Sequence, residues 1–209
     1  MTDTDDRAAF LAAHDVSRET LAKLDIIIAT LDEWRTRSNL IGPKEWPQIW
    51  TRHVGDSVQL LDRIPDTARV VDLGSGAGFP GLILAAGRPA GHVTMIESVG
   101  KKCAFLRAAI EAAGLPAEVH QGRVEAAPPI AASYVTARAF APLPELLEYA
   151  APWLCKGATG VFPKGERWKD ELTAAQQRWN FAYQAIPSRS GGSGVILIVR
   201  EAARRHGQA

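Results

Sequence analysis

The chain has 209 residues, of which 46% are hydrophobic and 22% charged, and its formal net charge is +1. These values indicate a globular protein of one domain with an appendage. The composition is not strongly basic, as it is in many nucleic-acid-binding proteins. Since no apolar run approaches the roughly 20 residues that span a bilayer and the acidic N-terminus lacks a signal-peptide pattern, we expect a cytoplasmic protein without membrane contact.

The first part of the chain, residues 5–63, reads as helical. A helix is predicted to start after Ser17, and a further helix should run from about Trp46 to Leu61. We expect residues 1–65 to form a helical segment that caps a core built from residues 66–209. Apolar residues recur at three- and four-residue spacing, as on one face of a helix, at Leu21, Leu24, Ile28 and Leu31.

From residue 68 onward, short apolar strands alternate with helical stretches. This alternation predicts an α/β fold with a doubly wound, mainly parallel sheet. Cys103 and Cys155 have no CxxC spacing or histidine-rich neighbourhood, so we expect two free, buried thiols and no metal site. The predicted strands are RVVDL, HVTMIE, AEVHQG, YVTARA, GATGVFP and GVILIVRE, with a further strand near 181–186.

The most informative stretch is VVDLGSGAGFPG, residues 70–81. Its glycines Gly74, Gly76 and Gly78 follow a strand and precede a helix, where backbone with positive φ lets a ligand approach the main chain. The spacing is GxGxG, whereas dinucleotide-binding proteins show GxGxxG and would not favour a carboxylate at Asp72. Asp72 would instead attract the ammonium and sulfonium groups of S-adenosylmethionine. An ordinary glycine-rich turn is the alternative.

Glu97 ends the following strand, 25 residues after Asp72. A carboxylate at this place can accept hydrogen bonds from both hydroxyls of a ribose. Enzymes that bind dinucleotides also use an acid here, so Glu97 supports a nucleoside ligand without choosing between the two classes.

The segment after the fourth strand of the core bears on the acceptor of the methyl group. It reads ARAFAPL, residues 137–143, and lacks the acid (or asparagine), two prolines and aromatic of exocyclic-amine methylases. Cys155 follows Leu154 and not a proline, unlike the nucleophile of many pyrimidine-carbon methylases. A pyridine-type ring nitrogen presents its own lone pair and needs neither a base nor a nucleophile, which favours such a nitrogen as the target.

Several motifs in order resemble the RsmG (GidB) family of bacterial 16S ribosomal RNA guanine N-7 methyltransferases over about residues 34–201. The resemblance implies the class I, Rossmann-like methyltransferase fold with a closing antiparallel hairpin, S-adenosylmethionine as donor and S-adenosylhomocysteine as product. It also implies 16S ribosomal RNA or the small ribosomal subunit as partner, and we expect a monomer. The matching pieces are NLIGP (39–43), RHVGDS (52–57), VVDLGSGAGFPG (70–81), ESVGKKCAFL (97–106), GRVE (122–125), ARAF (137–140) and PKG (163–165).

The resemblance also implies roles for single residues. Arg138 would be the catalytic residue, beside the donor or the reacting base. Ser75 and Ala137 stand where relatives often have threonine and serine, and both departures are conservative. The residues implied to bind the donor are Gly74, Phe79, Glu97, Val124, Glu125 and Arg138, and those implied to bind RNA are His53, Lys101, Lys102, Arg123 and Lys164.

Structural alternatives exist for some of these residues. His53 and Asp56 lie three positions apart and would form a structural pair or face the substrate. Arg123 would bind RNA or pair with Glu125 or a neighbouring acid, and the two lysines at 101 and 102 would contact phosphate or only solvent.

Three other functions compete with this interpretation. They are a methyltransferase for a small molecule or protein, a nucleotide-binding oxidoreductase, and a module that senses a nucleoside without catalysis. Asp72 disfavours the oxidoreductase, and a basic surface continuous with the donor pocket would disfavour the first competitor.

Overall fold

The computed structural model describes residues 3–190 and 192–205. Its centre is a seven-stranded sheet in the order β3-β2-β1-β4-β5-β7-β6, in which β7 is antiparallel to both of its neighbours. The other neighbouring pairs are parallel. The prediction of a doubly wound sheet with a closing antiparallel hairpin is confirmed. The strands are β1 (Arg69–Leu73), β2 (His92–Glu97), β3 (Ala117–Gln121), β4 (Tyr134–Thr136), β5 (Thr159–Lys164), β6 (Trp179–Pro187) and β7 (Val195–Arg204).

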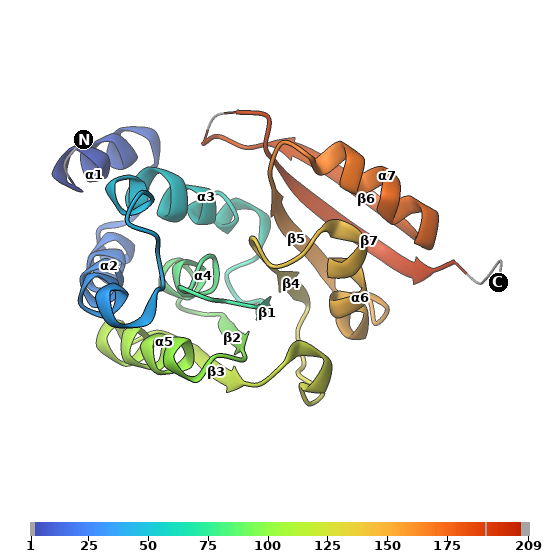
Figure 1. The fold of residues 1–209 in the computed structure, drawn as a ribbon, viewed down its shortest axis with the longest axis horizontal. Coiled ribbons are helices and arrows are strands. Elements are labelled where there is room, and N and C mark those ends of the chain that lie inside the picture. Colours follow the sequence, from blue (N-terminus) through green and yellow to red (C-terminus); the bar gives the residue numbers. More distant parts are fainter. Residues whose placement is uncertain (1–2, 191, 206–209) are drawn as a thin grey trace.

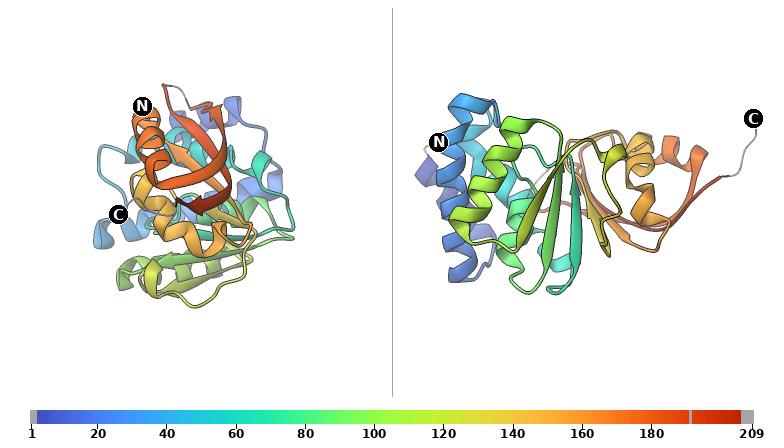
Figure 2. Two further views of the ribbon diagram at one scale, coloured as in Figure 1. Left: turned by 90° about the vertical axis from the view of Figure 1, so that its right-hand side faces the viewer. Right: turned by 90° about the horizontal axis from the view of Figure 1, so that it is seen from below.

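Helices cover both faces of the sheet (Figures 1 and 2). Because side chains alternate along a strand, Val70 joins the hydrophobic cluster on one face, and Val71 and Leu73 join the cluster on the other. The first cluster includes residues of α2, α4 and α5, and the second includes residues of α6 and α7. These helices are α2 (Arg18–Ser38), α4 (Gly81–Gly87), α5 (Gly100–Ala113), α6 (Leu143–Leu154) and α7 (Trp168–Arg178).

The N-terminal helices pack on the first of these faces. α1 (Asp3–Ala13) is tied to later elements by Asp6, whose Oδ2 accepts the backbone N–H of Trp50 at 2.7 Å. α2 begins where the sequence predicted, since the Ser17 hydroxyl accepts the N–H of Thr20. Figure 1 places α1 and α2 at one end of the molecule and the C-terminal end of β7 at the other, while the β6–β7 turn lies near α3.

The predicted helix between Trp46 and Leu61 forms, but it is irregular. It consists of a 3₁₀ turn η1 (Trp46–Gln48), a π-helical segment η2 (Ile49–Val54), a short α3 (Gly55–Val58) and a 3₁₀ turn η3 (Leu61–Arg63). π-Helical turns often occur at functional sites. Here the irregular stretch carries His53 and Asp56, which contact Arg138, two residues after the end of β4.

Two further expectations concern single features. Cys103 is buried as predicted, but Cys155 is exposed because it caps the C-terminus of α6. Among the described residues, no helix combines the length and the apolar character that a membrane crossing requires.

Candidate functional site

A cavity of about 510 Å³ lies at the carboxyl ends of β1, β2, β3 and β4, and we call it the first cavity. The segments that follow these four strands form most of its wall. This is the edge at which doubly wound sheets bind their ligands. The predicted site residues that line it are His53, Gly74, Gly76, Phe79, Glu97, Lys102, Arg123, Val124, Glu125 and Arg138.

The glycine loop after β1 needs glycine for two reasons. Gly74, Gly76 and Gly78 have φ of 64°, 56° and 86°, and residues that carry a side chain rarely adopt such angles. A Cβ on Gly74 would also lie 2.2 Å from Cδ2 of Phe140. Gly78 serves the turn and is not part of the cavity wall, because a Cβ there would point at Leu82, 2.3 Å from its Cδ1.

Glu97 is held in place by the loops beside it. Its Oε2 accepts the N–H of Gly76 at 2.9 Å and its Oε1 accepts the N–H of Val99 at 2.8 Å. The residue is only 6% exposed and lines the first cavity. Since each carboxylate oxygen can accept more than one hydrogen bond, both oxygens keep capacity for hydroxyl groups of a ligand.

Asp72 lies beneath the glycine loop and does not line the first cavity. Its side chain is fully buried, and Oδ1 accepts the hydroxyl of Thr136 at 2.9 Å. Oδ2 has no hydrogen-bond partner within the described part of the chain. Burial raises the pKa of this carboxyl from 3.8 to about 6. Asp72 would therefore act on a ligand through its charge and not through direct contact.

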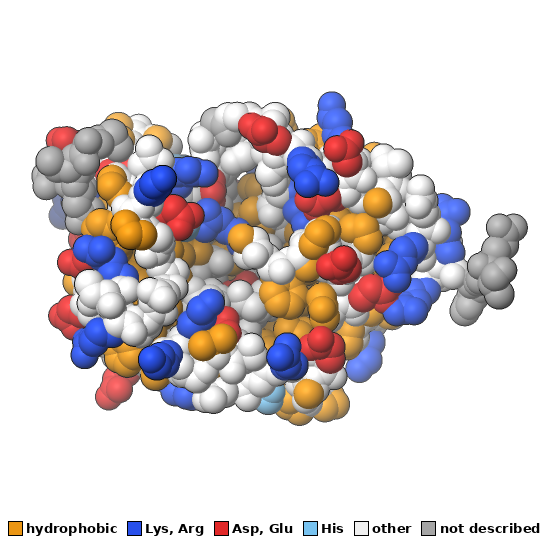
Figure 3. Space-filling view, in the orientation of Figure 1, with side chains coloured by type: hydrophobic (Ala, Val, Ile, Leu, Met, Phe, Trp, Pro, Cys, Tyr) orange, Lys and Arg blue, Asp and Glu red, His pale blue; other side chains and the backbone are white. Residues whose placement is uncertain are grey.

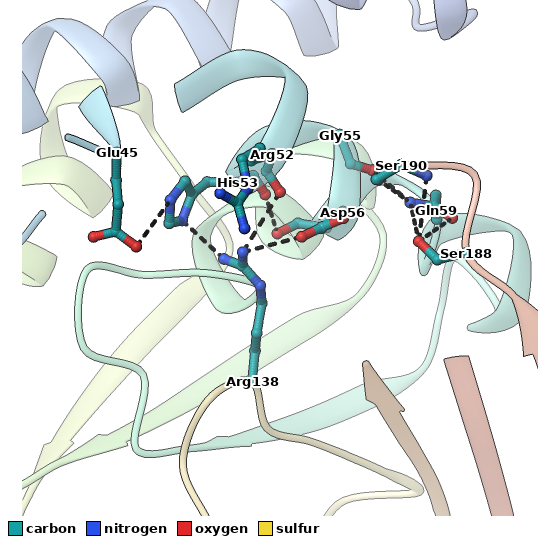
Figure 4. A network of polar contacts seen from close by, with 10 residues as sticks. Glu45, Arg52, His53, Gly55, Asp56, Gln59, Arg138, Ser188 and Ser190 are labelled. Carbon is teal, nitrogen blue, oxygen red and sulfur yellow. Dashed lines mark hydrogen bonds and ion pairs between the residues drawn. The ribbon is translucent and has the colours of Figure 1, made fainter. Parts of the chain in front are cut away.

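Arg138 follows β4, and its guanidinium is held by the irregular helical stretch (Figure 4). Nη1 lies 2.9 Å from Nδ1 of His53, and Nη2 donates to Oδ2 of Asp56 at 3.0 Å. A guanidinium only donates, so Nδ1 of His53 must accept and the imidazole proton lies on Nε2. Nε2 faces Oε1 of Glu45 at 3.9 Å.

The imidazole of His53 is neutral at physiological pH. Burial, and after it the positive charge of Arg138, lower the pKa of His53 from 6.5 to about 4. Among the described residues His53 and Asp56 do not pair with each other; each contacts Arg138, with His53 in the wall of the first cavity. That they face the substrate stays a prediction.

Arg138 also borders a second cavity, of about 920 Å³, which shares Arg138, Ala139 and Phe140 with the first. The second cavity lies between η2, the end of β5 and the β6–β7 turn. The face of the molecule shown in Figure 3 is hollowed near its middle, with lysine and arginine side chains around the hollow.

Lys164 lines the second cavity, but its ammonium already has partners. Nζ donates to the backbone oxygen of Ala141 at 2.9 Å and forms an ion pair with Glu171 at 2.7 Å. The side chain is 9% exposed. Its prediction as an RNA-binding residue stays open, with one N–H of the ammonium left for a ligand.

The other predicted RNA-binding cations lie at or near the mouth of the first cavity. Lys102 and Arg123 line that cavity, whereas Lys101 is exposed on α5 and belongs to neither wall. Within the described ranges, none of these three side chains takes part in an ion pair, so the predicted pairing of Arg123 with Glu125 is not observed.

Several apolar residues of the first cavity had no predicted role, among them Leu40, Ile41, Phe140 and Tyr149. Leu40 and Ile41 come from the loop after α2, and Phe140 packs edge-on against Tyr149 with ring centroids 5.1 Å apart. Phe140 lies two positions after Arg138, which was a usable signal. Nothing in the local pattern marks Tyr149, because an aromatic residue on α6 reads as core.

Comparison with known families gives a consistent match. The model of the GidB family, described as rRNA small subunit methyltransferase G, matches residues 20–192. A relative from Hyphomonas neptunium, named Ribosomal RNA small subunit methyltransferase G, is 81% identical over 206 residues, which cover 99% of this chain and 100% of the relative. A relative of the same name from Methylobacterium nodulans is 48% identical, over 93% of this chain and 94% of the relative.

Solved structures that resemble the chain share its fold at low sequence identity. The O-methyltransferase from Bacillus cereus in complex with SAH has a TM-score of 0.54 and 18% identity, covering 83% of this chain and 91% of that one. MtNAS in complex with MTA and tNA has a TM-score of 0.60 and 14% identity, covering 84% and 70%. These likenesses show the fold.

Proposed function

Because the chain belongs to the GidB family of rRNA small subunit methyltransferases, we propose that it methylates N-7 of a guanine in 16S ribosomal RNA, with S-adenosylmethionine as donor. The observation that carries this proposal is Arg138, which stands between a cavity suited to a nucleoside and a second, open cavity. The proposed place of action is the cytoplasm, and the proposed state is a monomer.

The residues of the first cavity fit the donor. Gly74 and Gly76 expose their backbone to the cavity, and a Cβ on Gly74 would clash with Phe140. Glu97 offers carboxylate oxygens for ribose hydroxyls. Phe79 and Val124 add apolar wall for an adenine ring. The donor supplies an electrophilic methyl group when bound, and Asp72 beneath the loop favours its positive charge electrostatically.

The second cavity is the proposed place of the acceptor base. Arg138 is common to both walls, so a base in the second cavity would meet the donor side at this residue. The N–H of Nε and one N–H of Nη1 have no partner within residues 3–190 and 192–205. Either can donate to a guanine oxygen and orient the base.

The local chemistry agrees with a target that carries no proton. His53 is neutral, but its Nδ1 lone pair accepts from Arg138 and its other nitrogen is protonated, so it cannot remove a proton from a substrate. N-7 of guanine has a free lone pair and needs no such base. Asp56 balances the charge of Arg138, which lowers the repulsion between this arginine and the cationic donor or product.

The experiment is a methylation assay with purified protein, a donor labelled in the methyl group, and small subunits from cells that lack the enzyme. N-7 methylguanosine sensitises RNA to reductive cleavage, so the methylated position is read as one strand scission. Label recovered only in exocyclic amines, in protein or in small molecules would refute the proposal.

A further inference from the structure

The buried side chain of Gln59 links the irregular helical stretch to the β6–β7 turn. Gln59 directly follows α3 and is 2% exposed. Its Nε2 donates to Ser190 Oγ at 2.8 Å, with longer contacts to Ser188 Oγ at 3.4 Å and to Gly55 O at 3.3 Å. Its Oε1 accepts the backbone N–H of Arg189 at 2.6 Å. Figure 4 shows this link beside the Arg138 network.

The turn held in this way forms part of the wall of the second cavity. Ser188 and Ser190 line that cavity together with Asp56, which binds Arg138. An ion pair between Arg189 and Asp62 adds a second tie between the turn and η3. One short helical stretch therefore positions both Arg138 and the turn that faces it across the second cavity.

The conformation of the turn is not fixed by packing. Ser190 and Arg189 are exposed and carry no large apolar side chain into the core, so hydrogen bonds must hold them. An uncharged amide with two donors and one acceptor oxygen meets the two serine hydroxyls and the backbone N–H at once. An apolar residue of similar size would leave the N–H of Arg189 without this partner.

We propose that Gln59 is a positioning residue for the RNA acceptor, since it holds residues 188–190 as a wall of the second cavity. The inference rests on the proposed function. It predicts that loss of the Gln59 amide raises KM for the small ribosomal subunit and leaves the donor affinity of the first cavity unchanged.

The test compares the wild type with Gln59→Met, with Ser188→Ala/Ser190→Ala, and with the triple variant. We expect KM for small subunits to rise by about tenfold in Gln59→Met, while kcat at saturating RNA and the Kd for S-adenosylhomocysteine change less than about twofold. Hydrogen exchange at the amide of Arg189 should accelerate, and exchange at Gly76 should not. Ser17→Ala, which removes the N-cap of α2, is the matched control for lost stability without a change in KM.

The triple variant separates two roles of the serines. If they act through Gln59, the triple variant has the same KM as Gln59→Met; if they contact RNA independently, the effects multiply. Wild-type KM in folded Gln59→Met, an equal loss of donor affinity, or multiplied effects would each overturn the inference. Failure of the proposed function is a different result, because then the wild type itself would not methylate the small subunit.

Discussion

Replacement of Arg138 by alanine tests the link between the two cavities in several ways. The change removes the donor to His53 Nδ1 and to Asp56 Oδ2. Hydrogen bonds to charged groups contribute about 1.5–3 kcal/mol each, and the side chains of Arg138 and Asp56 are 19% and 25% exposed, so solvent screens part of this. We expect Arg138→Ala to fold with about 2–3 kcal/mol less stability.

The effect on catalysis is separate from the effect on folding, because a variant that stays folded still lacks the guanidinium. Without an orienting guanidinium between donor and base, the single-turnover rate should fall by about 100-fold or more, which corresponds to about 2.7 kcal/mol. Arg138→Lys should recover little, because one ammonium cannot reach His53 and Asp56 with the geometry of the guanidinium. The rate is measured by rapid quench with saturating donor.

The same variant should change the titration of His53. In the wild type, burial and Arg138 lower the pKa of His53 to about 4. Removal of this cation in Arg138→Ala leaves burial and Arg52, which lower the pKa, and the acids Glu45 and Asp56, which raise it, so the NMR titration of His53 should move upward from about 4. An unchanged His53 titration, or a wild-type rate in folded Arg138→Ala, would refute the described network.

Three further predictions concern the donor site and the RNA. Glu97→Ala should weaken S-adenosylhomocysteine binding in calorimetry by about 1–3 kcal/mol, and unchanged affinity would remove Glu97 from the ribose site. Asp72 has a folded pKa of about 6 against 3.8 unfolded, so the folded state keeps the proton to higher pH than the unfolded state. The wild type should therefore lose about 2 kcal/mol of stability relative to Asp72→Asn as pH rises from 4 to 7. Denaturant titrations check this, and a pH-independent difference would contradict the burial of the charge. Replacing Lys101 and Lys102 by alanine should lower the log–log salt slope of RNA binding by about two without changing donor affinity, whereas an unchanged slope would assign both to solvated surface.

The sheet could be predicted from the sequence because its signals are local. Strands such as Arg69–Leu73 and His92–Glu97 are short apolar runs bounded by turns, and glycine spacing marks the ligand edge. The irregularity of η2 could not be predicted in this way. The N–H of Trp50 is bound by Asp6, a residue 44 positions earlier, and no local pattern reports such a partner.

The candidate site was predicted best for residues whose place follows from the end of a strand. Gly74, Gly76 and Glu97 lie at strand ends, so their place follows from the fold. Asp72 is the next-to-last residue of β1, and it lies under the glycine loop and not at the open edge of the sheet. Only the packing of α4 reveals this position. Tyr149 reaches the first cavity from α6, and the spacing of residues in the sequence does not indicate this position.

The methylated atom can be identified directly in the cell. The direct measurement is a comparison of 16S ribosomal RNA from cells with the protein, without it, and with Arg138→Ala in its place, by reductive cleavage and mass spectrometry. We expect one N-7 methylguanosine that is present with the wild type, absent without the protein, and strongly reduced with the variant. An identical set of N-7 methylguanosines in all three strains would contradict it.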